Sequence, residues 1–158
     1  MSPTDTLEGL AIARAMRDSE LLYATVQIFH TLGFTTLVGS VAVFDLRVLG
    51  LAKQISVRAL ARFLLPWTLA SFAVIVPTGL MMFSAHADDL LSNRAFELKM
   101  GLLLAAGMNG AYFHTGPYMT AKGWDTNAPA PWAARLSAAL SLALWIGVIA
   151  CGRLLAYL

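Results

Sequence analysis

Four long apolar runs separated by polar connections dominate the chain. They cover residues 21–44, 60–83, 96–114 and 132–157. Each run holds about 19 to 26 residues, and a helix needs ~20 to cross the hydrocarbon core of a bilayer. Because backbone polar groups in lipid must be satisfied within the chain, each run is expected to be a helix. The pattern predicts an all-α fold, an integral membrane four-helix bundle spanning residues 21–158.

Residues at the ends of the runs predict where the helices begin, bend and stop. Ser19 is suited to be the N-cap of the first helix. Pro66 suits the early turns of the second helix, and Pro77 with Gly79 is expected to bend its far half. The stretch GWDTNAPAPW (123–132) is rich in Gly, Asn and Pro, which is typical of a loop.

A mixed polar and apolar tail, residues 1–20, precedes the first run. It lacks the basic flank, apolar block and small-residue cleavage site of a secretory signal, so the spans themselves are expected to direct insertion. Residues 6–17 could form a short helix lying in the membrane interface. The alternative is a frayed tail.

Small residues recur at helical spacing within three of the runs. In lipid, helices associate by close approach of their backbones, so faces of small residues predict interhelical contacts. These residues are Gly33 and Gly39 in the first run, Gly101, Ala105, Gly107, Gly110 and Ala111 in the third, and Ala134, Ser137, Ala138 and Ser141 in the fourth.

The composition agrees with a membrane environment. The chain is 58% hydrophobic and only 13% charged, whereas soluble domains are nearer ~25% charged. A globule of 158 residues has too much surface to hide that excess. The net charge of +2 implies no broad basic field for nucleic acid. The single cysteine, Cys151, excludes an internal disulfide.

The basic residues beside the runs predict the orientation in the membrane. The 45–62 connection carries four of them, whereas the 84–99 connection carries two together with three acids. Because cytoplasmic flanks are enriched in Lys and Arg, the first and third connections are expected to face the cytoplasm. Both termini would then face outward.

Ionisable residues within or beside the runs fall into two layers by depth, at 1.5 Å of travel per helical residue. Groups at matching depth could pair across helices, and Asp45 is expected to meet Arg135 or His114. A structural clamp at the cytoplasmic boundary is the main interpretation of Asp45 and Arg47. The outer layer holds His30, His86, Glu97, Lys99 and Arg153, and the inner layer holds Asp45, Arg47, Asn109, His114 and Arg135.

The outer layer favours a b-type heme. His30 and His86 lie on different helices at similar expected depth, and each could give a neutral imidazole nitrogen to iron. Lys99 and Arg153 could pair with the heme propionates. The structural alternatives are an interhelical hydrogen bond for His30 and an exposed position at a helix end for His86.

A copper or other metal site is the second hypothesis. Its candidate ligands are His30, His86 and His114, with Glu97 on the outer side, although His114 lies several turns from His30 in register. No close His-x-His, Met-x-x-Met or Cys-x-x-Cys spacing supports it. The chain also lacks a Gly-rich phosphate loop, a GxSxG elbow and an HExxH motif, so no catalytic residue is assigned.

Four motifs carry a resemblance: H-T-L-G…V-G-S-x-x-x-x-D-L-R-V-L-G (30–50), F-E-L-K-M (96–100), M-N-G-A-Y-F-H (108–114) and G-R-L-L-A-Y (152–157). Together they resemble an uncharacterised family of small bacterial inner-membrane proteins with four helices. His86 lies outside this pattern. A fainter similarity is to four-helix b-type cytochromes and to the membrane domain of copper-resistance proteins. The family's recurring marks fall on His30, Asp45, Arg47, Lys99, Asn109, His114 and Arg153.

The leading functional hypothesis is therefore binding of heme b near the outer face, serving electron transfer. The alternatives are a non-catalytic membrane subunit or partner-binding protein, and a protein that handles copper or another small solute. The expected partners are the lipid bilayer, a membrane or periplasmic protein, and a second copy of the chain.

Overall fold

The computed structural model describes residues 3–155 and 157. Every regular element in this part of the chain is a helix, which confirms the predicted all-helical class. The elements are α1 (Pro3–Glu8), α2 (Ala11–Asp18), α3 (Glu20–Leu49), α4 (Val57–Ala85), α5 (Ala87–Ser92), α6 (Arg94–Thr115), the 3₁₀ helix η1 (Pro117–Gly123) and α7 (Trp132–Leu154).

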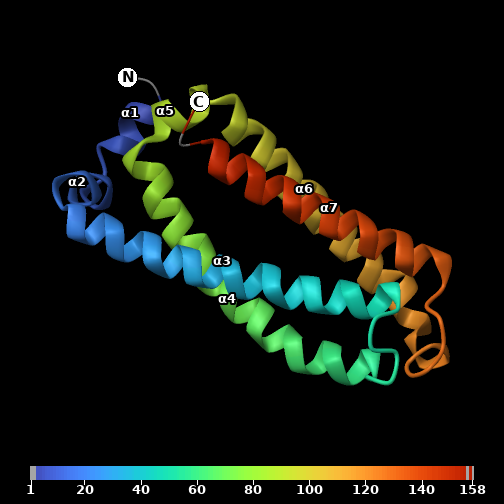
Figure 1. Cartoon of the computed structure of the whole chain (residues 1–158). Helices are drawn as coiled ribbons and strands as arrows, with labels where there is room; N and C mark the ends of the chain where they lie inside the picture. Colours follow the sequence, from blue (N-terminus) through green and yellow to red (C-terminus); the bar gives the residue numbers. More distant parts are fainter. Residues whose placement is uncertain (1–2, 156, 158) are drawn as a thin grey trace.

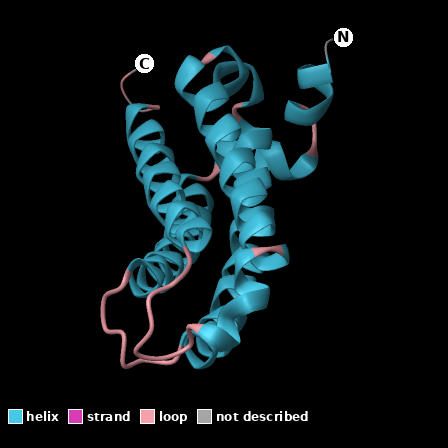
Figure 2. Ribbon diagram, turned by 90° about the vertical axis from the view of Figure 1, so that its right-hand side faces the viewer, coloured by secondary structure: helices cyan, strands magenta, loops and turns pink. Residues whose placement is uncertain are grey.

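The four long helices form two antiparallel pairs (Figure 1). α3 packs along α4, α6 packs along α7, and α3 also contacts α7, so the order in space is α4, α3, α7, α6. The pairs meet at the end that carries the 50–56 and 116–131 connections, which lie together at the bottom of Figure 2. We call this the closed end. The opposite end, where α5 bridges α4 to α6, is the open end.

The helix boundaries follow the apolar runs to within a few residues. The N-cap at Ser19 is confirmed, because its hydroxyl accepts from the Leu22 amide at 3.2 Å. α3 extends five residues beyond its run to Leu49 and stops at Gly50, whose φ of 118° suits glycine. α4 begins at Val57, so Pro66 lies inside the helix rather than in its first turns.

The chain ahead of α3 folds into two helices instead of one. α2 buries Ala13 and Met16 against α3 and α4, so this segment is packed rather than frayed. The break between α1 and α2 falls at Gly9 and Leu10, inside the 6–17 range expected to form one helix.

The apolar core has three layers along the bundle. At the closed end, one cluster joins Val48, Val57, Phe113, Trp124 and Ala134, and so includes all four long helices. A middle cluster around Leu37, Ala106, Trp145 and Val148 joins α3, α6 and α7. At the open end, the cluster of Met16, Val26 and Ala85 includes only α2, α3 and α4. The two helix pairs therefore diverge toward the open end.

The predicted small-residue contacts are found in part. A Cβ at Gly33 would lie 3.0 Å from Ile75 Cγ1, so this glycine allows α3 to approach α4 closely. On α7, Ala134, Ser137 and Ala138 are buried. The prediction is wrong for four other glycines, because a Cβ there would meet nothing within 4 Å. These are Gly39, Gly101, Gly107 and Gly110.

Three of the described helices, α3, α4 and α7, are long and apolar enough to cross a membrane. α6 is not among them, because Lys99, Asn109 and His114 lower its hydropathy. Large apolar side chains cover the outside of the long helices, as expected where the solvent is lipid. They include Leu21, Phe29, Leu32, Phe63, Trp67, Leu80, Leu104 and Ile146.

Candidate functional site

The ring of His30 is held by α4. Its Nδ1 lies 3.0 Å from the Thr78 hydroxyl oxygen, and that hydroxyl donates its own proton to the Val74 carbonyl at 2.6 Å. A hydroxyl has one proton, so while it donates to Val74 the Thr78 oxygen can only accept from His30, which requires the tautomer with the proton on Nδ1. In the neutral imidazole this leaves Nε2 with an unshared electron pair. His30 therefore offers a nitrogen acceptor to a ligand.

The glycine at position 79 makes room for this ring. A Cβ at Gly79 would lie 3.1 Å from Cε1 of His30 and 3.6 Å from its Nδ1. Because only backbone stands there, the imidazole packs directly against α4. Gly79 and Thr78 thus fix the position of the His30 ring together.

A cavity of about 200 Å³ lies in front of His30, between α3 and the α6–α7 pair. Lys99 of α6 lines the same cavity. Its Nζ packs near Gly152 of α7, because a Cβ at that glycine would lie 3.9 Å from the Lys99 Nζ. Among the side chains that the structure describes, no carboxylate forms an ion pair with Lys99. The remaining lining residues are Thr31, Phe34, Val148 and Ile149.

A larger cavity of about 520 Å³ follows the same face of α3 toward the open end. The α3 residues that line the two cavities repeat every three or four positions from Glu20 to Phe34, so they form one helical stripe. His86, the C-cap of α4, belongs to this larger cavity and packs edge-on against Tyr23, with ring centroids 5.7 Å apart. Its other lining residues are Met16, Arg17, Ala24 and Gln27.

The expected match in depth between His30 and His86 is not found. His30 lies beside Thr78 and Gly79, whereas His86 lies beside Tyr23. Tyr23 and His30 are seven residues apart on α3, which is about 10 Å along the helix axis. The two histidines therefore stand about two turns apart, in different cavities.

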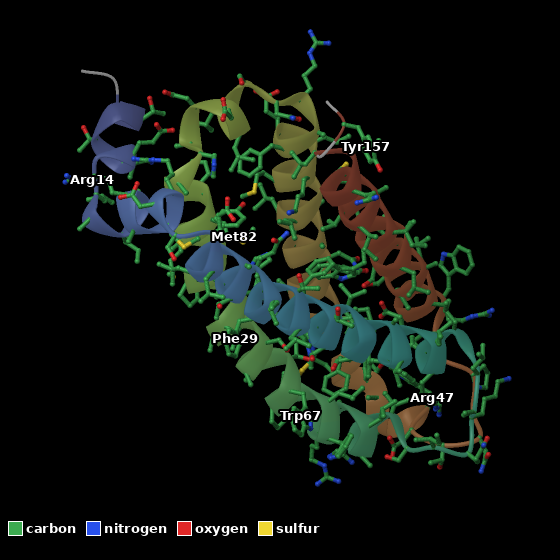
Figure 3. All side chains as sticks on the ribbon, turned by 60° about the vertical axis from the view of Figure 1, so that its left-hand side comes forward. Arg14, Phe29, Arg47, Trp67, Met82 and Tyr157 are labelled. Atoms are coloured by element: carbon green, nitrogen blue, oxygen red, sulfur yellow. The ribbon has the colours of Figure 1, made fainter. Side chains whose placement is uncertain are left out.

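The other two expected outer-layer cations differ in their surroundings. Lys99 faces the cavity in front of His30. The exposed Arg153 instead turns toward Tyr157, which is labelled in Figure 3: it donates to the Tyr157 hydroxyl at 2.9 Å, and its Cζ lies 5.2 Å from the ring centroid. Lys99 is thus the cation that stands beside His30.

The three histidines do not come together as a metal site. His114 is exposed on the last turn of α6 at the closed end, with its ring against Phe113 and Tyr118. The part of the chain that the structure describes contains no cluster of three or more His, Cys, Asp or Glu side chains that could hold a metal ion. Glu97 is exposed on the first turn of α6.

The inner-layer residues are arranged differently from the expected pairs. Asp45 is buried and faces Ser141 of α7. Arg135 and His114 are exposed, and neither forms an ion pair with Asp45. Asn109 instead pairs with Ser137: its Nδ2 donates to the Ser137 carbonyl at 3.0 Å, and the Ser137 hydroxyl donates to its Oδ1 at 2.9 Å.

Arg47, which is labelled in Figure 3, hydrogen-bonds to both connections of the closed end. Its guanidinium donates to the carbonyls of Ile55 at 2.6 Å, Lys53 at 3.0 Å and Asp125 at 3.0 Å. It is 3% exposed, so these charge-assisted hydrogen bonds are shielded from water. Arg47 is therefore a structural clasp between two loops far apart in sequence.

Asp125 is the residue that sequence reasoning missed. Its carboxylate accepts from the Arg58 amide at 2.8 Å and from the Ser56 hydroxyl at 2.9 Å. The Arg58 amide, with the Ser56 hydroxyl and the charges of Arg58 and Arg47, holds the pKa of Asp125 below its usual range. The available signal was an acidic residue within a Gly- and Pro-rich loop, close to the basic 45–62 connection.

These features define an all-helical protein with helices apolar enough for a membrane and a histidine–lysine cavity between its helix pairs. The chain belongs to a family of unknown function (DUF6644), which matches residues 15–158. The resemblance to a family without a known function is thereby confirmed. No curated protein and no solved structure was found to match the chain.

Proposed function

We propose that this protein binds heme b beside α3, where Nε2 of His30 would hold the iron, and serves electron transfer in the membrane. The observation that carries the proposal is the 3.0 Å contact between Nδ1 of His30 and the Thr78 hydroxyl, which in the Nδ1–H tautomer is a hydrogen bond donated by the ring. A histidine that binds a metal through one ring nitrogen almost always donates the N–H of the other to a protein acceptor. His30 has this arrangement without any metal being needed to impose it.

The two cavities along α3 would take a ligand with both apolar and polar parts, because Phe34 and Val148 line the smaller one whereas Arg17 and Glu20 line the larger one. Ligand sites commonly measure about 300–1,000 Å³, so the cavity before His30 alone is small. The larger cavity lies farther along the same stripe of α3, which runs from Glu20 to Phe34 over about 21 Å of helix. A macrocycle bound at His30 would extend along this stripe, with Phe34 and Val148 against its faces.

Lys99 supports an anionic ligand. Its ammonium group faces the cavity without a carboxylate partner among the described side chains, so it is available to a propionate group. When bound, the iron would supply one-electron chemistry. Because His86 lies two turns away from His30, the heme is expected to have one histidine ligand.

The proposed topology has four spans, with both ends of the chain on the outer face of a bacterial inner membrane. α6 has 22 residues, about 33 Å of helix, and packs along α7, so it can cross a hydrocarbon core of ~30 Å. The closed end carries Arg47, Lys53, Arg58 and Arg62, which favours the cytoplasmic side.

The deciding experiment is an absorption spectrum of the detergent-purified protein made with ample heme, oxidised and then reduced with dithionite. We expect a Soret band in the wild type and in His86→Ala, and none in His30→Ala. The reduced protein should bind carbon monoxide, because no second histidine occupies the level of His30. Lys99→Ala should weaken heme binding without abolishing the band.

Other outcomes would overturn the proposal and identify the alternatives. A colourless wild-type protein that also fails to bind added hemin excludes a heme site. Such a protein would be a non-catalytic subunit if it co-purified with a larger membrane complex. It would handle copper if elemental analysis found that metal without a Soret band.

A further inference from the structure

The carboxyl group of Asp45 is enclosed between α3 and α7 near the closed end. The residue is 6% exposed, and its Oδ2 has no hydrogen-bond partner. The neighbouring polar group is the Ser141 hydroxyl of α7. A buried polar atom without a partner is rare in folded proteins, so this oxygen calls for a physical explanation.

No positive charge compensates Asp45. Arg47, on the same helix, directs its guanidinium to the carbonyls of Ile55, Lys53 and Asp125. On α7 Arg135 is exposed, and at the end of α6 His114 is exposed. On α4 the basic residues of this end, Arg58 and Arg62, are also exposed, and on the facing side of α6 Asn109 is paired with Ser137.

A carboxylate in this position would be costly. An ionised group removed from water without a counter-charge is strongly disfavoured, whereas the neutral acid loses little on burial. A metal cation in place of the proton does not fit, because hard cations take about six oxygen ligands. The carboxyl group of Asp45 and the hydroxyl of Ser141 fall well short of that number.

We propose that Asp45 is a proton-binding site of the bundle: its carboxyl group is neutral when α3 packs against α7, and its ionisation requires the two helices to loosen or to admit water. Closing the contact between Asp45 and Ser141 then takes up one proton from solution. The site lies 15 residues from His30 along α3, about 22 Å, so it does not depend on heme binding.

Infrared spectroscopy tests the protonation state directly. The wild type should show the carbonyl stretch of a protonated carboxyl group above the amide I band, with a downshift in D₂O. The band should be absent in Asp45→Asn and moved in Asp45→Glu, which keeps the acid on a longer side chain. A wild-type spectrum without this band, or an unchanged band in Asp45→Asn, would overturn the proposal.

Thermal melting across pH tests the coupling to packing. Asn is nearly the same shape as the neutral acid and cannot ionise. At low pH, Asp45→Asn and the wild type should therefore melt at similar temperatures. As pH rises and the carboxyl group ionises, the wild type should lose several degrees relative to Asp45→Asn, because the charged form favours the loosened state.

Ser141→Ala is the matched control, since it removes the neighbouring hydroxyl but keeps the acid. It should retain both the infrared band and the pH dependence of the wild type. Melting curves of the wild type and Asp45→Asn that stay parallel at all pH values would contradict the coupling. If Asp45→Asn fails to fold, the band in the wild type and its movement in Asp45→Glu still decide the protonation state.

Discussion

The two ends of the bundle handle polar groups in opposite ways. At the closed end, all four long helices share one apolar cluster, and Arg47 and Asp125 are satisfied by backbone and hydroxyl partners. At the open end, the apolar cluster excludes α6 and α7, and His30 and Lys99 line a cavity. The closed end thus satisfies Arg47 and Asp125 within the protein, although Oδ2 of Asp45 has no partner there, whereas toward the open end a cavity lies in front of His30.

The two ends also differ in the surroundings of their basic side chains. One such side chain is hydrogen-bonded within the protein, and the other faces a cavity. Arg47 lies on α3 and Lys99 on α6, and both are basic side chains of long helices. Arg47 has three carbonyl acceptors, whereas Lys99 has no ion pair with any side chain that the structure describes and faces a cavity. The partners of a charged side chain, rather than its depth in the membrane, distinguish the two roles.

The largest effect on folding stability is expected when the hydrogen bonds of Arg47 at the closed end are removed. Arg47→Ala leaves the carbonyls of Ile55, Lys53 and Asp125 without their donor, and should cost about 1–3 kcal/mol of folding stability, as for buried polar groups left unsatisfied. Thermal melting in detergent measures this. Arg58→Ala, which removes an exposed side chain but keeps the amide that binds Asp125, is the control and should cost much less. Equal losses in the two variants would contradict the clasp.

A smaller effect, on heme affinity, is expected when the packing of α4 against the His30 ring is altered. Gly79→Ala places a methyl group 3.1 Å from Cε1 of His30, so the ring must shift by a few tenths of an ångström. We expect heme to bind roughly tenfold more weakly, about 1.4 kcal/mol. Hemin titration followed at the Soret band checks this. Gly39→Ala is the control, because its added methyl group meets open space, and this variant should bind hemin as tightly as the wild type. If Gly39→Ala weakened hemin binding as much as Gly79→Ala, the contact between Gly79 and the His30 ring would not explain the loss of affinity.

The smallest effect concerns pH at the closed end. Because the pKa of Asp125 is lowered in the folded protein, its stabilising contribution is present above the unfolded pKa of an aspartate. It is lost as pH falls through the lowered pKa. Melting curves between pH 6 and the acid limit should show Asp125→Asn less stable than the wild type by under about 1 kcal/mol near neutrality, converging as the pH falls. A constant difference between Asp125→Asn and the wild type at all pH values would count against the assignment.

Sequence reasoning located the long helices because apolar runs and caps are local signals. Ser19 begins α3 as predicted, and each long helix overlaps its run. The register between α3 and α4 was not predictable in the same way. It depends on how Gly33 fits against Ile75, which sets Thr78 beside His30 and Tyr23 beside His86. Estimates of depth from the midpoints of the runs carry no information on that contact.

The role of one polar residue at the closed end could not be predicted from the sequence for the same reason. Asp125 gains its role from Ser56 and Arg58, which are more than sixty residues away in sequence. Nothing in the stretch around Asp125 indicates those partners. Likewise, the short helices α5 and η1 have too little apolar periodicity to be predicted, and they depend on the long helices that they connect.

The hydrogen bonds of Arg47 also form in a fixed order while the chain is being synthesised. Two of its acceptors, Lys53 and Ile55, leave the ribosome soon after it, but Asp125 follows 78 residues later. A growing chain that has made only α3 and α4 thus holds a partly unsatisfied guanidinium at its loop. The bond to Asp125 forms only after α6 has been made, so this contact distinguishes a nearly finished chain from a truncated one.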